Sequence, residues 1–151
     1  MRHWLMKSEP DEFSFAELER KGQEPWTGVR NYQARNFLRA AQVGDLVLFY
    51  HSNCAAPGIV GVAKVTKAAF DDPTQFDPKS DYFDAKSTQA NPRWSCLEVS
   101  FHQTFRRLVS LPDLRECAAL KEMLILRPGN RLSVTPVTAA EFKAIATLGR
   151  G

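Results

Sequence analysis

Three short stretches of the chain set aromatic rings beside hydrogen-bonding and cationic side chains. Residues 26–35 read WTGVRNYQAR, residues 50–52 read YHS, and residues 92–94 read PRW. Rings and guanidinium groups stack on nucleobases, while amides and hydroxyls hydrogen-bond to base edges. The stretches therefore suit a flat ligand with a polar edge, such as a nucleobase. The side chains behind this interpretation are Trp26, Asn31, Tyr50, His51, Ser52, Pro92, Arg93 and Trp94.

The longest of these stretches, residues 26–35, also fits a purely structural interpretation. Asn31 is typical of a helix N-cap, and the pattern predicts a helix through Tyr32 and Leu38 with Trp26 packed beneath it. A glycine at position 28 gives a loop that could instead bring the tryptophan close to a ligand. Composition alone supports both interpretations equally.

The sequence offers few candidates for catalysis. Lys7, Ser8 and Glu9 follow an apolar segment, and a desolvated lysine beside a hydroxyl and a carboxylate could act as base or nucleophile. An ion pair at a strand end explains the same trio. His51 and Cys54 are neighbours, but no third group that would orient them is evident. We therefore predict no catalytic residue.

The sequence also lacks the patterns of metal and cofactor sites. The histidines at positions 3, 51 and 102 fall on separate expected elements without ligand spacing. The segment GIVG at residues 58–61 has neither the spacing nor the lysine of a phosphate-binding loop. We predict neither a bound metal nor a cofactor.

Length and composition indicate one globular domain. The 151 residues, of which 44% are hydrophobic and 25% charged, fit a single domain over residues 1–151. The net charge of +3 is too small to prove a polyanionic partner. Acids concentrate in residues 9–24 and 71–84, whereas Arg30, Arg35 and Arg39 have no acid near them in sequence. One basic face is therefore compatible with the sequence.

Cysteine usage and hydropathy bear on the compartment. Cys54, Cys96 and Cys117 are odd in number and widely spaced, which argues against a disulfide framework. No apolar run approaches the ~18 residues of a membrane span, and the apolar patch in residues 1–6 is too short for a signal segment. We therefore expect reduced thiols, no membrane association and a cytoplasmic location.

Periodicity and capping patterns predict a mixed set of short elements. Strands are expected at residues 3–6, 46–51, 58–65, 94–101 and 132–136. Helices are expected after the caps Ser14, Asn31 and Thr138. Residues 71–91 predict an ordered surface excursion or lid. Because strands and helices do not alternate regularly, we predict an α+β fold, a curled, mostly antiparallel β-barrel with peripheral short helices.

Six segments resemble the EVE domain family, and they follow one another in order along almost the whole chain. The segments are WLMKSEP (4–10), WTGVRNYQAR (26–35), GDLVLFYHS (44–52), GIVG (58–61), PRW (92–94) and RLSVTPV (131–137). The resemblance implies a PUA-like fold, related to the YTH and SRA readers of modified bases. It further implies binding of a modified base in an aromatic-walled pocket, chiefly 5-methylcytosine or 5-hydroxymethylcytosine in DNA.

The resemblance also implies a role for each selected side chain. Trp26 and Trp94 would form pocket walls, and Ser8 and Asn31 would read the base edge. The pocket floor would be Tyr50, His51 and Ser52. The groups that approach phosphate would be Lys7, Arg30, Arg35 and Arg93. A base in a duplex would have to be flipped out, at a cost of a few kcal/mol that stacking and phosphate contacts offset.

Two other functions remain open from the sequence. PUA-like relatives include amidohydrolases with a lysine near a strand end, so Lys7 could serve a small hydrolase that acts on a modified nucleoside. A general RNA-binding module would instead bind according to salt concentration, without regard to base modification. We favour a reader of a modified base that is not an enzyme.

Overall fold

Six β-strands form one sheet, in the order β2-β5-β4-β3-β1-β6, in the computed structural model, which describes residues 1–151. The strands are β1 (His3–Ser8), β2 (Gln23–Pro25), β3 (Leu46–His51), β4 (Gly58–Asp71), β5 (Ser95–Ser110) and β6 (Val134–Val137). β1 and β3 run parallel, and every other neighbouring pair is antiparallel. The prediction of a mixed, mostly antiparallel sheet is confirmed.

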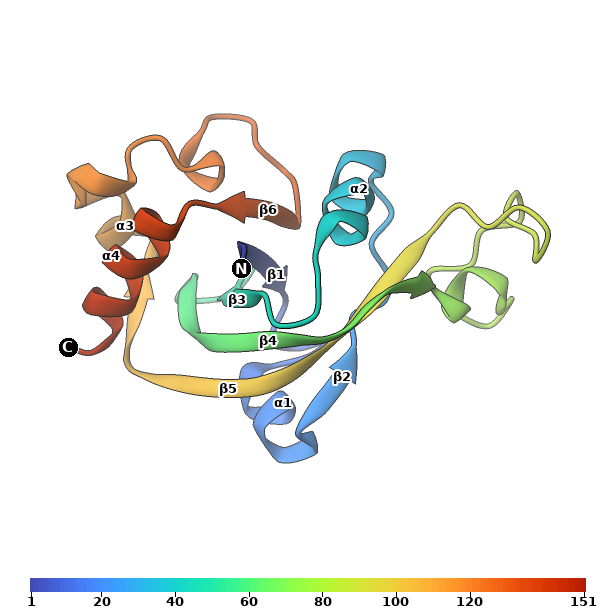
Figure 1. Ribbon diagram of the computed structural model, residues 1–151, viewed down its shortest axis with the longest axis horizontal. Helices are drawn as coiled ribbons and strands as arrows, with labels where there is room; N and C mark the ends of the chain where they lie inside the picture. Colours follow the sequence, from blue (N-terminus) through green and yellow to red (C-terminus); the bar gives the residue numbers. More distant parts are fainter.

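Irregular pairing of the two longest strands, β4 and β5, curls the sheet. Their register shifts at several places, the first between Ile59 and Gly61, and each bulge bends its strand and increases the local twist. Figure 1 shows both strands sweeping around β1 and β3. The outer strands β2 and β6 remain edges. The curled fold is therefore as predicted, although hydrogen bonds do not close it into a full barrel.

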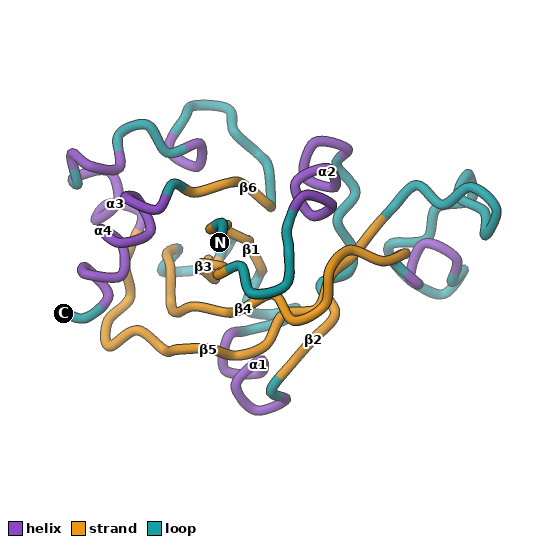
Figure 2. The backbone as a smooth tube through the Cα atoms, viewed as in Figure 1, coloured by secondary structure: helices purple, strands orange, loops and turns teal.

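The α-helices lie around the sheet, as Figure 2 shows. They are α1 (Phe15–Lys21), α2 (Tyr32–Ala40), α3 (Leu111–Glu116) and α4 (Ala139–Gly149), and short 3-10 helices occupy Pro73–Phe76, Ala118–Leu120 and Leu124–Leu126. The predicted caps are present. The hydroxyls of Ser14 and Thr138 each accept an N–H from the first turn of α1 and α4, and the Asn31 side chain accepts the Ala34 N–H at 3.0 Å. Local sequence therefore sets where these helices begin.

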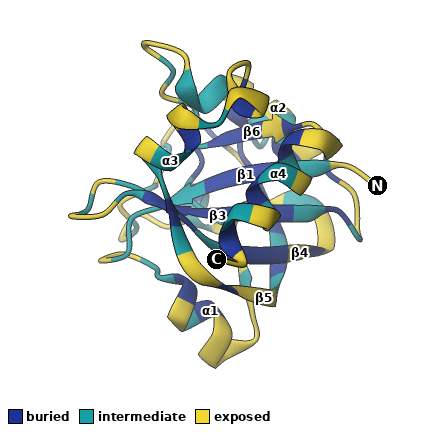
Figure 3. Cartoon of the chain, turned by 90° about the vertical axis from the view of Figure 1, so that its left-hand side faces the viewer, coloured by how far each residue is buried: buried dark blue, intermediate teal, exposed yellow.

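Alternation along β3 divides the core between the two faces of the sheet. Phe49 belongs to a buried cluster that contains Trp26 and Leu38 of α2. Tyr50, the next residue, belongs to a second cluster that contains Ile145 of α4. Figure 3 shows the central strands buried beneath these helices. The strand ends that emerge from this double-sided core are therefore held rigidly.

Residues 72–94 form a lobe beyond the paired ends of β4 and β5, at the right of Figure 1. The buried amide of Gln75 donates to the carbonyls of Asp72 and Trp94 at 2.7 and 2.8 Å. Its oxygen accepts the Trp94 N–H at 3.0 Å. One side chain thus ties the two stems of the lobe together, and the segment is an ordered excursion.

The cysteines, the possible metal ligands and the hydropathy of the helices can each be checked in this fold. All three cysteines are free, and burial raises the pKa of the Cys96 thiol to about 12, which keeps it protonated and unreactive. No three His, Cys, Asp or Glu side chains gather as they would around a metal ion. No helix combines the length and the apolar character needed to cross a membrane.

Candidate functional site

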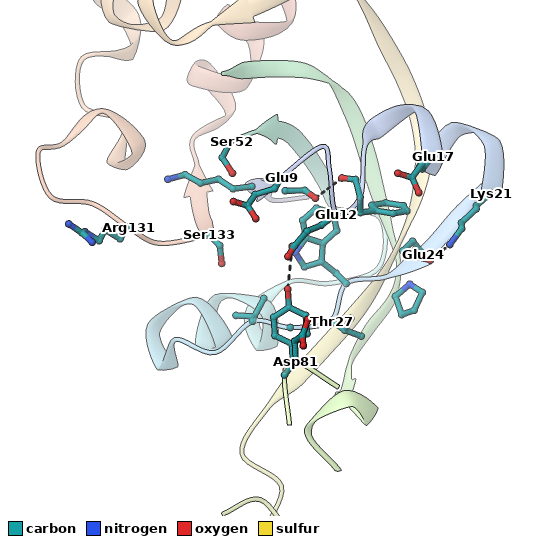
Figure 4. Close-up of a pocket in the computed structure, with 18 residues that line it drawn as sticks. Glu9, Glu12, Glu17, Lys21, Glu24, Thr27, Ser52, Asp81, Arg131 and Ser133 are labelled. Carbon is teal, nitrogen blue, oxygen red and sulfur yellow. Dashed lines mark hydrogen bonds and ion pairs between the residues drawn. The ribbon is translucent and has the colours of Figure 1, made fainter. Parts of the chain in front are cut away.

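The parallel pairing of β1 and β3 places the ends of both strands side by side. Ser8 pairs with His51, and the Ser52 N–H donates to the Ser8 carbonyl at 3.0 Å. A cavity of about 710 Å³ opens beyond these ends (Figure 4). Its walls come from the segments that follow β1, β2 and β3, from α1, from the lobe and from the loop before β6. The cavity is therefore assembled from regions far apart in sequence.

Trp26 lines the cavity from inside the core. Only 8% of the residue is exposed, and its ring meets the Phe49 ring edge-on at 5.3 Å. Trp4 and Trp94 donate their indole N–H groups to carboxylates, whereas the Trp26 indole N–H has no acceptor in the protein and is not buried. The largely buried Trp26 ring is therefore fixed before a ligand arrives, which reduces the entropy cost of binding.

The segment after β1 folds back and forms one wall of the cavity. The Glu9 carbonyl accepts the N–H groups of Glu12 and Phe13, both at 2.9 Å. The Ser8 hydroxyl donates to the Phe13 carbonyl at 2.6 Å. Ser8 thus uses its single O–H donor on this wall and keeps only acceptor capacity for a ligand.

The lobe forms the opposite wall through Tyr82. Gly28 has a φ of 85°, and a Cβ at this position would lie 2.8 Å from the Tyr82 ring. Glycine is therefore required both by its backbone and by the close approach of the ring. The Tyr82 hydroxyl donates to the Glu12 carboxylate at 3.3 Å. This hydrogen bond joins the lobe to the wall that follows β1.

Arg30 and Asp72 anchor the lobe and leave no group free for a ligand. The fully buried Asp72 carboxylate accepts the Gly28 N–H at 2.8 Å and the Arg30 Nη1 at 3.1 Å. The Arg30 guanidinium also donates twice to the Tyr82 carbonyl, and once each to the Val29 carbonyl and the Thr74 hydroxyl. These five contacts use all five of its donors. The expected phosphate contact by Arg30 therefore does not fit the structure.

Charged groups surround the cavity unevenly. The acids that line it are Glu9, Glu12, Glu17, Glu24 and Asp81, and the cations are Lys7, Lys21 and Arg131. Desolvation by burial lowers the pKa of Lys7, whose ammonium forms no ion pair. Burial, reinforced by the Glu12 carboxylate, raises the pKa of Tyr82 and keeps its hydroxyl a neutral donor. The cavity can therefore accept hydrogen bonds more readily than it can hold an anion.

Four of the seven expected base-binding residues lie outside this cavity. Tyr50 points into the second core cluster, and Asn31 caps α2. His51 accepts the Phe15 N–H at 3.2 Å through Nε2, and burial lowers its pKa, so it is a neutral anchor for α1. Trp94 stacks on Tyr32 at 4.8 Å. The structure therefore does not bring Trp94 and Trp26 together as two walls of one pocket.

Arg35 and Arg93 also lie away from the cavity lining. Arg35 donates from Nη1 to the Arg93 carbonyl at 3.0 Å, and its guanidinium lies over the Tyr32 ring, 4.7 Å from the centroid. The Arg93 Nη1 lies 3.9 Å from the Asp84 carboxylate. Both side chains thus pack along the surface between α2 and the lobe. Of the expected residues, the cavity contains Lys7, Ser8, Trp26 and Ser52.

Sequence reasoning missed several groups that complete the cavity. Glu9, Phe13, Tyr82 and Arg131 line it but were not selected. Glu9 stands in the sequence as part of a polar trio, and Tyr82 lies within the excursion of residues 71–91. Arg131 opens one of the six family segments, which was the available signal. Their convergence depends on contacts between distant segments, which local patterns do not contain.

A curled sheet with an aromatic-lined polar cavity at its strand ends defines this chain as a small PUA-like domain. The chain belongs to the EVE domain family, whose pattern matches residues 2–148. A solved structure of a protein from Pseudomonas syringae is 49% identical, with a TM-score of 0.95 over 97% of this chain and 99% of that chain. The crystal structure of human THYN1 protein in complex with DNA that contains 5-methylcytosine is 38% identical, with a TM-score of 0.95 over 100% of this chain and 99% of that chain. Human thymocyte nuclear protein 1 is 40% identical over 97% of this chain and 73% of its own length.

These relatives correct the expected location. The relatives from chicken, human and rat are called thymocyte nuclear protein 1, which points to a nuclear and not a cytoplasmic protein. Free thiols and the lack of an apolar segment do not separate these compartments, because both keep cysteines reduced. The expectation of a cytoplasmic location is therefore wrong.

Proposed function

We propose that residues 1–151 act as one module that binds nucleic acid and reads a modified cytosine in DNA. The supporting observation is the human THYN1 protein in complex with DNA containing 5-methylcytosine, which shares this fold over the full chain at 38% identity. The cavity of this chain adds independent support, because it combines fixed aromatic surface with unused hydrogen-bonding groups.

A flipped base would enter the cavity beside Trp26. Flipping costs a few kcal/mol, and contact with an aromatic side chain contributes roughly 1–3 kcal/mol per base. The rings of Phe13 and Tyr82 add further apolar surface, and Ser8 and Ser52 offer oxygen atoms. The base-binding set that we propose is thus smaller than the one expected from sequence, and it replaces Trp94 by Tyr82.

Phosphate contacts are assigned to Lys7 and Arg131. Both line the cavity, and neither forms an ion pair within the protein. A cation without a carboxylate partner can neutralise a phosphate without first breaking a bond. Arg30, in contrast, has no free donor.

The test measures binding of duplexes that contain one 5-methylcytosine or one cytosine by fluorescence anisotropy. Tighter binding of the methylated duplex is expected. Trp26→Leu should weaken that binding by about tenfold or more, from the stacking contribution. Trp94→Leu is the matched control and should leave the preference for the methylated duplex unchanged. Equal affinity for both duplexes, unaltered by Trp26→Leu, contradicts the proposal, and equal binding of unmodified RNA favours a general RNA-binding module.

One observation favours a second candidate, a small hydrolase that acts on an acylated cytidine. Lys7 lies in the cavity with Ser8 and Ser52, and burial lowers its pKa, which brings the amine closer to the range in which a lysine can act as a general base. Incubation with acylated cytidines should then release acid, and Lys7→Ala should abolish the release while Lys21→Ala retains it. An absence of turnover by the wild-type protein removes this candidate.

A further inference from the structure

Glu9 places a carboxylate with an unused acceptor inside the cavity. Figure 4 shows its side chain pointing into the cavity, in this view between Ser52 and Ser133. The carboxylate takes part in none of the four ion pairs of the protein. Its Oε1 accepts a hydrogen bond from the Asn53 amide, and its Oε2 has no partner within the protein. Because Glu9 is only half-buried, a ligand can reach this second oxygen.

Asn53 holds the Glu9 carboxylate from the neighbouring strand end. Since β1 and β3 are parallel and in register, the residues that follow them emerge from the sheet together. Asn53 has a φ of 51°, the only positive φ among the non-glycine residues. Asparagine adopts this left-handed conformation more readily than other non-glycine residues. The residue that donates to Glu9 therefore has a backbone conformation that suits asparagine or glycine.

A carboxylate in this position discriminates between pyrimidines by their exocyclic groups. An ionised carboxylate only accepts hydrogen bonds. Cytosine presents an amino donor at C4, whereas thymine presents a carbonyl acceptor there. On the major-groove edge, 5-methylcytosine and thymine carry the same methyl group and differ in the C4 substituent. A thymine carbonyl opposite Glu9 would set two acceptors against each other and leave both unsatisfied.

We propose that Glu9 is a specificity-determining residue, whose Oε2 accepts the exocyclic amino group of the bound base, and that Asn53 is its positioning residue. This inference rests on the proposed function, since it concerns the base that enters the same cavity. It names the protein group that would separate 5-methylcytosine from thymine in that cavity. It also gives one of the acids that line the cavity a role that phosphate binding does not explain.

The experiment measures, for each protein variant, the ratio of its affinities for 5-methylcytosine and thymine. Each base is placed opposite an abasic site in the same duplex, so that neither base has a pairing partner to lose on flipping. Binding is measured by fluorescence anisotropy for the wild-type protein, Glu9→Gln, Asn53→Gly and Asp81→Asn. Glutamine keeps the shape of Glu9 but adds a donor, and glycine keeps the positive φ of Asn53 without its amide. Asp81→Asn is the matched control, an exposed acid that also lines the cavity.

The wild-type protein should bind 5-methylcytosine at least about tenfold tighter than thymine, the discrimination expected from one hydrogen bond to a charged group. Glu9→Gln should bring this ratio close to one, and Asn53→Gly should reduce it. Asp81→Asn should change both affinities equally and keep the ratio. A ratio that Glu9→Gln leaves intact overturns the role of Glu9 while the reader function stands. Failure of the wild-type protein to bind either duplex overturns both the reader function and the inference.

Discussion

Replacement of Asp72 by alanine should weaken the connection between the lobe and the loop after β2. The carboxylate accepts hydrogen bonds from the Gly28 N–H, from Arg30, and from both the N–H and the hydroxyl of Thr74. The Asp72 side chain is fully buried and that of Arg30 is 21% exposed, so water would replace little of what is lost. Removal of one partner of a buried ion pair costs about 3–5 kcal/mol. We expect the free energy of unfolding to fall by that amount.

A milder substitution, Asp72→Asn, should remove only some of these contacts. Hydrogen bonds to a charged group each contribute about 1.5–3 kcal/mol, and contributions within one network are not additive. Asp72→Asn keeps an oxygen that can accept the Thr74 N–H but loses the charge opposite Arg30. This variant should therefore lose about 2 kcal/mol. It should also bind DNA more weakly, because Gly28 and Tyr82 lose part of their common support.

The free energy of unfolding of both variants is measured by urea denaturation monitored by circular dichroism. Asp71→Ala is the matched control, since this neighbouring carboxylate is exposed, and surface substitutions of this kind change stability by less than about 0.5 kcal/mol. A loss below about 1 kcal/mol for Asp72→Ala, or an equal loss for the control, would refute the assignment of Asp72 as the anchor of the lobe.

Two further predictions concern charge. Burial acts to raise the pKa of the Asp45 carboxyl, but hydrogen bonds from an indole and two backbone N–H groups outweigh it and hold the pKa below its usual value of 3.8. The ionised carboxylate therefore stabilises the fold above pH ~4, and this contribution is lost as the pH falls through the lowered pKa. Urea unfolding should give a lower free energy of unfolding at pH 3 than at pH 6, and Asp45→Asn should reduce that difference. A pH dependence that Asp45→Asn leaves unchanged contradicts the reasoning. In salt titrations of DNA binding, Lys7→Ala and Arg131→Ala should each reduce the slope of log affinity against log salt by about 0.9. Arg35→Ala should leave that slope unchanged, and equal slopes for all variants contradict the assignment.

The local elements of the fold were predictable because their causes lie within a few residues of one another. Ser14 and Thr138 each precede a glutamate by three residues, and both capping boxes form where expected. The apolar run that ends at His51 is a central strand, and residues 71–91 are an ordered excursion. Capping, alternation and turn formation depend on short-range sterics and hydrogen bonds. A sequence contains these directly.

The cavity was predictable only in part, because aromatic and polar residue types do not state which way a side chain points. Tyr50 and Phe49 are neighbours in sequence, yet β alternation sends them into opposite cores. Arg30 has the residue type of a phosphate contact, but an aspartate 42 positions away uses it as an anchor. Such partnerships between distant segments follow from strand pairing and packing.

The sequence by itself determined the family, the positions of the caps and central strands, and the presence of polar groups at the ends of β1 and β3. Only the tertiary structure decided which of those groups share a cavity. The parallel register of β1 with β3 brings Glu9 beside Asn53, and the fold of the lobe places Tyr82 against Gly28. Long-range contacts bring these side chains together, and packing of the whole core must offset the entropy lost when the intervening loops close. It therefore becomes visible only once the chain is folded.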